Sequence, residues 1–274
     1  MPAAANGTLM NSSPTDTVAP IAEWLAPTPD QFRDEILPSR QPAVLRSVAR
    51  DWPLVRAAHK DPHEALLLLE AGASAHVANV IRAEPEEDGR FHYSKDGQSF
   101  NFTRGQGNVA GILAGLRELA TSYRPFSMAA QAMPADRYFP GFTLTHQMPM
   151  VPPATEPRLW IGNAGKVATH NDPFENIAVV AAGRRRFTLF PPSAETDLYM
   201  GPHHPTPAGA RISMVHLTAP DFARFPRFAA ALKVAQTAEL SPGDAIFIPC
   251  HWYHHVEALE RFNILVNYWW DTAS

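Results

Sequence analysis

After about residue 157 the chain is a series of short stretches rich in aliphatic and aromatic residues, separated by proline and glycine. Short apolar stretches that are bounded in this way are typical of β-strands. Gly183 ends one stretch, and Pro191 with Pro192 stops another. The predicted strands cover residues 158–162, 176–182, 185–190, 212–217, 237–240, 245–249, 252–258 and 262–270. About eight short strands joined by such turns predict a mainly β protein built as a sandwich or jelly roll.

The first half of the chain mixes helical periodicity with short apolar stretches. Thr28 is a suitable cap for a first helix, and Gly72 ends a second one. Helices are predicted over residues 30–36, 61–71, 108–119 and, with an interruption near Pro226, 222–234; strands are predicted over 42–49, 75–81 and 90–93, and 126–133 fits either state. We expect a flexible tail (1–20) and a single domain (21–274), in which a helix-rich N-terminal portion (21–125) packs on a β core (126–274).

Composition narrows the class of protein. The 274 residues carry a net charge of −4, so the sequence gives no sign of nucleic-acid binding. The single cysteine, Cys250, excludes an internal disulfide and a zinc site built from cysteines. The N-terminus lacks the pattern of a secretory signal, and no apolar stretch reaches the roughly 18 residues of a membrane helix. We therefore expect a cytoplasmic protein that does not enter a membrane.

A candidate metal site comes from two separate segments. His170 and Asp172 are two residues apart, so in an extended chain both side chains project from one face. A histidine-rich segment, residues 251–255, follows about eighty residues later. Two histidines and one carboxylate form the facial triad of non-haem Fe(II) oxygenases, which leaves coordination positions open. Taken alone, a His-x-Asp pair is more often a turn aspartate beside a surface histidine.

His254 and His255 compete for the third ligand position, because neighbours on a strand point to opposite faces. Alternation groups His254 with Trp252 and Val256, and it groups His255 with Tyr253 and Glu257. The first group is the more apolar, so we expect His254 to face the interior. His251 follows a turn and is a weaker candidate, and His203 and His204 are interpreted as loop residues.

Arg185 is a candidate for binding an anion inside the fold. It shares a strand face with Phe187 and Leu189, and a buried arginine requires an anion such as the distal carboxylate of 2-oxoglutarate. The alternatives are a buried acidic partner, or a strand turned so that the arginine faces water. Asn176 and Asn267 could hydrogen-bond the co-substrate or a metal-bound water, or they could satisfy backbone groups at strand ends.

These motifs resemble the cupin-like JmjC family of 2-oxoglutarate oxygenases, in particular the branch with the hypoxia-inducible factor asparaginyl hydroxylase. The resemblance covers residues 158–271 and, more weakly, the chain from Trp24. It is carried by His170-x-Asp172, Asn176, residues 183–192, 220–226 and 242–244, Trp252-Tyr-His254-His-Val and residues 266–270. It implies a double-stranded β-helix, with a helix-rich N-terminal portion packed on the barrel.

Residue by residue, the resemblance makes His170, Asp172 and His254 the ligands of Fe(II). It places Asn176 and Asn267 near the 2-oxoglutarate co-substrate, with Arg185 where the family has a lysine for the distal carboxylate. Segment 165–169 lacks the family's threonine at its usual place, which leaves Thr169 as a substitute. The tyrosine that the family has near residues 126–133 is not evident.

The resemblance therefore predicts an Fe(II)- and 2-oxoglutarate-dependent hydroxylase of a protein side chain or a small molecule. Two alternatives remain open from the residues alone: a metal-binding cupin that does not use 2-oxoglutarate, and a non-catalytic barrel. A homodimer is a further expectation from the family. Trp269 is interpreted as barrel core, with lining of the substrate cavity as the alternative.

Overall fold

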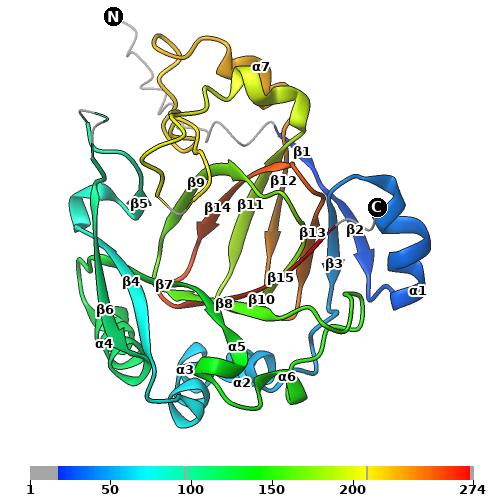
Figure 1. Ribbon diagram of the computed structural model, residues 1–274, viewed down its shortest axis with the longest axis vertical. Helices are drawn as coiled ribbons and strands as arrows, with labels where there is room; N and C mark the ends of the chain where they lie inside the picture. Colours follow the sequence, from blue (N-terminus) through cyan, green and yellow to red (C-terminus); the bar gives the residue numbers. More distant parts are fainter. Residues whose placement is uncertain (1–17, 96, 98, 208, 272–274) are drawn as a thin grey trace, which may run out of the picture.

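The computed structural model describes residues 18–271, apart from residues 96, 98 and 208. Two β-sheets face each other across the centre of the molecule (Figure 1). The six-stranded sheet runs, in spatial order, β1 (Ala19–Pro20), β12 (Gln236–Leu240), β11 (Arg185–Phe190), β14 (Tyr253–Ala258), β9 (Lys166–Asn171) and β5 (Arg90–Phe91). The nine-stranded sheet runs β2 (Ala22–Leu25), β3 (Ala43–Arg46), β13 (Ala245–Ile248), β10 (Glu175–Ala182), β15 (Asn263–Trp270), β8 (Pro157–Gly162), β7 (Ser127–Pro134), β4 (Val77–Ala83) and β6 (Phe102–Asn108).

The space between the sheets is filled by side chains from both, including Phe187 and Leu189 from β11, and Ala178 and Val180 from β10. The outer face of the nine-stranded sheet is covered by helices whose apolar faces form a second core. The longer helices of this core are α2 (Pro53–Lys60), α3 (Pro62–Gly72) and α4 (Val109–Thr121), whereas α7 (Phe228–Lys233) packs in a separate cluster with Phe190 of β11. Short helical segments are α1 (Pro29–Gln31), η1 (Phe32–Ile36), η2 (Leu37–Ser39), η3 (Pro85–Glu87), α5 (Ala135–Tyr138), α6 (Phe142–Thr145) and η4 (Pro192–Asp197).

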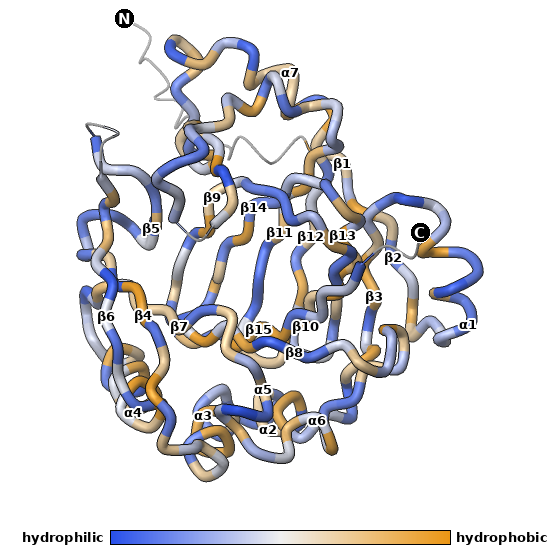
Figure 2. The backbone as a smooth tube through the Cα atoms, in the orientation of Figure 1, coloured by the Kyte–Doolittle hydropathy of each residue, from blue (hydrophilic) through white to orange (hydrophobic). Residues whose placement is uncertain are grey.

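Strand β10 shows why some strands of these sheets have continuous apolar sequences and no alternation of apolar and polar residues. All eight of its residues are buried, because one face meets the helices and the other meets the opposite sheet. Figure 2 shows the contrast between the apolar colouring of β3 and the polar colouring around α1. The mainly β, jelly-roll architecture predicted from the sequence is confirmed.

The turn between β10 and β11 depends on Gly183. Its φ of +73° lies in the left-handed region, and a Cβ there would lie 2.5 Å from the carbonyl oxygen of Phe262. Glycine alone fits this turn without strain. Because the turn joins the two sheets, it also sets the position of Arg185, the first residue of β11.

Several local predictions were wrong. Residues 212–217 form no strand, and one isolated bridge joins Ser213 to Met200; the Ser213 hydroxyl donates to the carbonyl of Leu198 and accepts from the N–H of Val215, which holds the segment in a turn. The helix expected from residue 222 begins only at Phe228, after Pro226. The tail expected over 1–20 is also wrong at its end, because Ala19–Pro20 pairs with β12; residues 1–17 lie outside the described residues.

The N-terminal portion contributes more β-structure than the sequence indicated. It supplies β2, β3, β4 and β6 to the nine-stranded sheet, in addition to α2, α3 and α4. Strands β6 and β9 and helix α2 were not predicted, whereas 126–133, which fitted either state, is strand β7. Among the described residues, no helix combines the length and the apolar character that crossing a lipid bilayer demands.

Asp244 ties the turn before β13 to β3. Its carboxylate accepts hydrogen bonds from the backbone N–H groups of Ser47 (3.0 Å) and Ser241 (3.1 Å) and from the Nη1 of Arg46 (2.7 Å). Asp244→Ala would leave both N–H groups unpaired beside a partly buried guanidinium. We expect a loss of about 3 kcal/mol in the free energy of unfolding, measured by urea denaturation.

The control for this variant is Asp51→Ala, which removes an exposed carboxylate that also pairs with an arginine, Arg56. It should change the free energy of unfolding by less than about 1 kcal/mol. Equal effects of the two substitutions would show that burial of Asp244 contributes nothing.

Candidate metal centre

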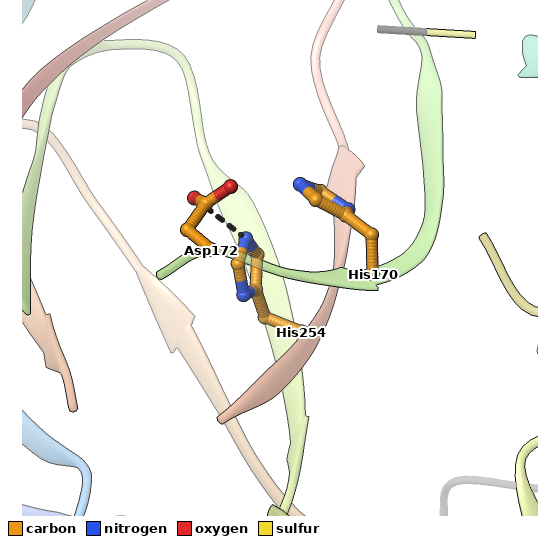
Figure 3. A group of neighbouring side chains, drawn as sticks. All are labelled: His170, Asp172 and His254. Atoms are coloured by element: carbon orange, nitrogen blue, oxygen red, sulfur yellow. Dashed lines mark ion pairs between the residues drawn. The ribbon is translucent and has the colours of Figure 1, made fainter. Parts of the chain in front are cut away.

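Three side chains converge at one end of the space between the sheets. His170 lies on β9, Asp172 directly follows that strand, and His254 lies on β14 (Figure 3). One ligand atom from each of these residues lies within 4.8 Å of the others. The Nε2 of His254 is 3.7 Å from Oδ2 of Asp172, and the two imidazole centroids are 4.3 Å apart. The structure thus brings the predicted triad together on one side of a shared point.

The pairing of β9 with β14 produces this arrangement. His170 is the register partner of His254, and Val167 is the partner of Val256. Two residues, 168 and 169, therefore stand opposite His255 alone, which is a β-bulge. The bulge lets Val167 and His170 both contribute to the cavity wall although they are three residues apart.

Backbone carbonyl groups set the orientation of both imidazoles. The Nδ1 of His170 lies 2.9 Å from the carbonyl oxygen of Ala168, and the Nδ1 of His254 lies 3.2 Å from that of Trp252. A carbonyl oxygen only accepts, so each Nδ1 carries the proton and each Nε2 keeps a free lone pair. Burial lowers the pKa of His254 to about 4, and the neighbouring His170 adds to the effect, which keeps the ring in the neutral form that binds metals.

Asp172 is held by two donors. The indole N–H of Trp269 donates to its Oδ2 at 3.2 Å, and the backbone N–H of His251 donates to its carbonyl oxygen at 3.0 Å. Trp269 was first interpreted as barrel core, with cavity lining as the alternative, and it does line the cavity beside the triad. The hydrogen bond to Asp172 was not anticipated; the only sequence signal is that Trp269 lies two residues from Asn267, on the same strand face.

His255 points away from the triad. It lies on the opposite face of β14, is buried, and has no hydrogen-bond partner for either ring nitrogen. Burial lowers its pKa to about 3. With His92 and His216 it lines a small pocket of about 10 Å³ behind the strand. His254 instead shares the inner face with Trp252 and Val256, as strand alternation indicated.

His170 and Asp172 of the triad line a cavity of about 300 Å³. Residues from both sheets, from the β4–β7 region and from the loop before Ile212 form its wall: Ile81, Phe91, Phe102, Gln131, Ala132, Trp160, Val167, Ala168, Pro207, Ala210, Ile212 and Trp269. The wall is apolar apart from Gln131, the indole N–H groups, His170 and Asp172. A ligand on the metal would therefore sit in a largely water-excluding space.

Arg185 is buried inside the fold. It is 7% exposed, and it shares its strand face with Phe187 and Leu189 of the interior core. Among the described residues no carboxylate lies within ion-pairing distance, and its Nε has no acceptor. Burial lowers its pKa to about 10, so the guanidinium stays charged at neutral pH. Of the interpretations left open by the sequence, neither a buried acidic partner nor a strand turned to water matches this environment.

Two asparagines meet in the interior. Asn267 Nδ2 donates to Asn176 Oδ1 at 3.0 Å, and Asn267 Oδ1 is buried without a donor. Thr169, in contrast, is buried but is not part of the wall of the cavity. Its suggested role in co-substrate binding stays a prediction.

Two facing sheets with a cluster of metal-binding groups between them define a jelly-roll protein of the cupin type. The sequence profile of the cupin-like domain family matches residues 29–274, nearly the whole chain, and the chain belongs to this family. The expected relationship to JmjC-type proteins is confirmed.

Curated relatives include lysine-specific demethylase JMJ31 of Arabidopsis thaliana (36% identical over 41% of this chain and 20% of that protein) and human HSPB1-associated protein 1 (36% over 42% and 23%). Mouse tRNA wybutosine-synthesizing protein 5 is 31% identical over 37% of this chain and 29% of that protein. The chain thus spans less than a third of the length of these relatives.

The donor set of the triad fits Fe(II). Two imidazole nitrogens and one carboxylate oxygen on one side of a point are the facial arrangement of non-haem iron sites with open positions. The unpaired guanidinium of Arg185 and its orphaned Nε equally fit an anionic co-substrate in the same interior. Both groups are therefore compatible with the residues present.

We expect the purified protein to bind one Fe(II) per chain, and His254→Ala to abolish this binding, because two ligands cannot retain the metal. The matched control is His251→Ala, which removes an exposed histidine from the same segment. Metal content measured by plasma emission spectrometry checks the prediction. Loss of iron in His251→Ala but not in His254→Ala would contradict the assignment of the triad.

The half-buried His216 should make the protein acid-sensitive. Burial lowers its pKa to about 4, and His92 and Arg90 add to the effect. The unfolded chain, with a pKa near 6.5, then binds more protons than the native state between pH 6.5 and pH 4, so stability falls as the pH drops through this window. His216→Asn should flatten the pH dependence of the urea midpoint, whereas the exposed His59→Asn should not.

Proposed function

We propose that this protein is an Fe(II)- and 2-oxoglutarate-dependent oxygenase that hydroxylates a protein side chain or a small molecule. The observation that carries the proposal is the combination of an open His170, Asp172 and His254 triad with the buried, unpaired Arg185 in the same barrel. Burying an unpaired arginine lowers the stability of the protein. In a metal-binding barrel without an anionic co-substrate, nothing would offset this cost of burying Arg185.

The chain's own residues would orient the reactants. The carbonyl groups of Ala168 and Trp252 and the indole of Trp269 hold the three side chains that would bind the ion. Fe(II) bound there would supply the activation of O₂. The overall reaction converts 2-oxoglutarate, O₂ and a substrate C–H group into succinate, CO₂ and a C–OH group. The apolar walls exclude water from this chemistry.

In this proposal, Arg185 binds the far end of the co-substrate. Leu189 is paired with His254, and Arg185 lies four residues earlier on the same face of β11. At a rise of about 3.3 Å per residue, the two positions are separated by roughly 13 Å along the strand. A dicarboxylic 2-oxo acid that chelates the metal can extend along this direction and offer its second carboxylate to the guanidinium.

The character of the cavity favours hydroxylation over demethylation. JMJ31 is named for lysine demethylation, and its substrate would bring a cationic methylammonium group to the metal. Among the described residues lining the cavity, the only carboxylate is Asp172, which belongs to the triad. An uncharged C–H group therefore matches these walls better than a cation does.

The co-substrate half of the proposal is tested by an anaerobic titration. Addition of 2-oxoglutarate to the Fe(II)-loaded protein should produce a visible metal-to-ligand charge-transfer band. Arg185→Ala should raise the dissociation constant for 2-oxoglutarate by about 100-fold or more while iron content stays unchanged, because the carboxylate loses a charged bidentate partner. The control Arg186→Ala removes the neighbouring arginine, which pairs with Glu239 outside the barrel.

The proposed function fails if neither the band nor succinate release from 2-oxoglutarate appears across a broad panel of substrates. Iron binding without a band would instead support a metal-binding cupin that does not use 2-oxoglutarate. A protein that binds no metal in any assay would support a non-catalytic barrel.

A further inference from the structure

Two buried N–H donors inside the barrel have no acceptor. Apart from the ring N–H of His255, which lies on the face of β14 away from the triad, the orphaned side-chain donors among the described residues are the Nε of Arg185 and the Nε1 of Trp160. Leaving a buried donor unpaired costs about 1–3 kcal/mol. Two such donors in one interior indicate that an acceptor from outside the chain completes the structure.

The two donors reach the interior from opposite sheets. Trp160 lies on β8 of the nine-stranded sheet, and Arg185 lies on β11 of the six-stranded sheet. Trp160 packs against the interior cluster that includes Phe187 and Leu265, and Arg185 lies two residues before Phe187 on the same face of β11. Trp160 is also part of the cavity wall beside the triad, with its ring 6.4 Å from that of Trp269. Trp160 therefore borders both the cavity and the interior core that Arg185 faces.

The number of lone pairs on a carboxylate explains why one arginine does not suffice. An ionised carboxylate offers about four acceptor positions, and a bidentate guanidinium occupies two of them. In an apolar interior the remaining positions need further donors, since water is excluded. An indole N–H is suited to this place because it only donates and carries no charge, so it satisfies a lone pair without changing the net charge of the pair.

We infer that Trp160 donates a hydrogen bond from Nε1 to the distal carboxylate of 2-oxoglutarate and acts with Arg185 as the binding site for that group. The inference rests on the proposed function. It makes Trp160 a specificity-determining residue: the pair selects 2-oxo acids with a second carboxylate against those without one. The two tryptophans then have different roles: Trp160 binds the co-substrate, and Trp269 holds Asp172.

The test is a calorimetric titration of Fe(II)-loaded protein without oxygen. Trp160→Phe keeps an aromatic ring and removes the N–H. It should bind 2-oxoglutarate about 10- to 100-fold more weakly than the wild type, which corresponds to one lost hydrogen bond to a charged group. Affinity for 2-oxobutyrate, which has no second carboxylate, should be the same in both proteins.

Trp270→Phe is the matched control. It makes the same chemical change on the same strand as Trp269, but its ring packs against Phe32 and Phe247 outside the barrel. This variant should bind both acids as the wild type does.

A second measurement on the wild type covers the case in which Trp160→Phe does not fold. In protein loaded with diamagnetic Zn(II), the indole N–H resonance of Trp160 should move downfield when 2-oxoglutarate is added, and should stay in place with 2-oxobutyrate. The same shift with both acids would overturn the inference.

The outcomes also separate the inference from the proposed function. If the wild type binds 2-oxoglutarate in an Arg185-dependent way and Trp160→Phe binds it equally well, the role of Trp160 is wrong and the proposed function stands. If the wild type does not bind 2-oxoglutarate at all, both fail.

Discussion

The antiparallel pairing of β9 with β14 is the constraint on which the candidate site depends. It sets His170 opposite His254, and it carries Asp172 just past the end of β9 so that its carboxylate turns back toward both rings. Strand pairing fixes Cα positions to within the tolerance of the backbone hydrogen bonds, so the ligands need no flexible loop to meet. The bulge at residues 168–169 is part of the same constraint. Val167 and His170 are three residues apart and would face opposite sides of a regular strand, and the bulge turns His170 to the inner face.

A second consequence of the two facing sheets is that the interior has to hold polar groups without water. Asn267 Nδ2 finds an acceptor in Asn176 Oδ1, and Asp172 accepts from the indole of Trp269, whereas Asn267 Oδ1 has no donor. The Nε of Arg185 and the Nε1 of Trp160 have no acceptor. An unpaired buried polar group lowers the stability of the folded protein. Such groups therefore indicate where a ligand binds better than polar groups that already have a partner in the chain.

The sequence predicted the fold and the triad where strand alternation is regular. Arg185, Phe187 and Leu189 share one face, and Trp252, His254 and Val256 share another, as their spacing indicates. Alternation fails where the ladder is irregular or local hydrogen bonds replace it. Thr169 lies in a β-bulge, and no residue in the segment predicts that bulge. Ile212 belongs to a turn that is held by Ser213, and not to a strand. Strand β9 was missed because a strand that carries ligands is too polar to resemble a core strand.

Strand β15 connects the helix-covered core to the candidate metal site. Its inner face presents Asn267 and Trp269, whereas its outer face presents Ile264, Val266 and Tyr268 to the helix-covered core. Because side chains alternate with a period of two, a shift of one residue in β15 would turn every inner group outward and expose the apolar ones. Packing against the helices therefore fixes the register that brings the Trp269 indole to Asp172. The N-terminal portion is remote from the metal ligands in sequence. Its helices nevertheless help to hold those ligands in place, because they fix the register of β15.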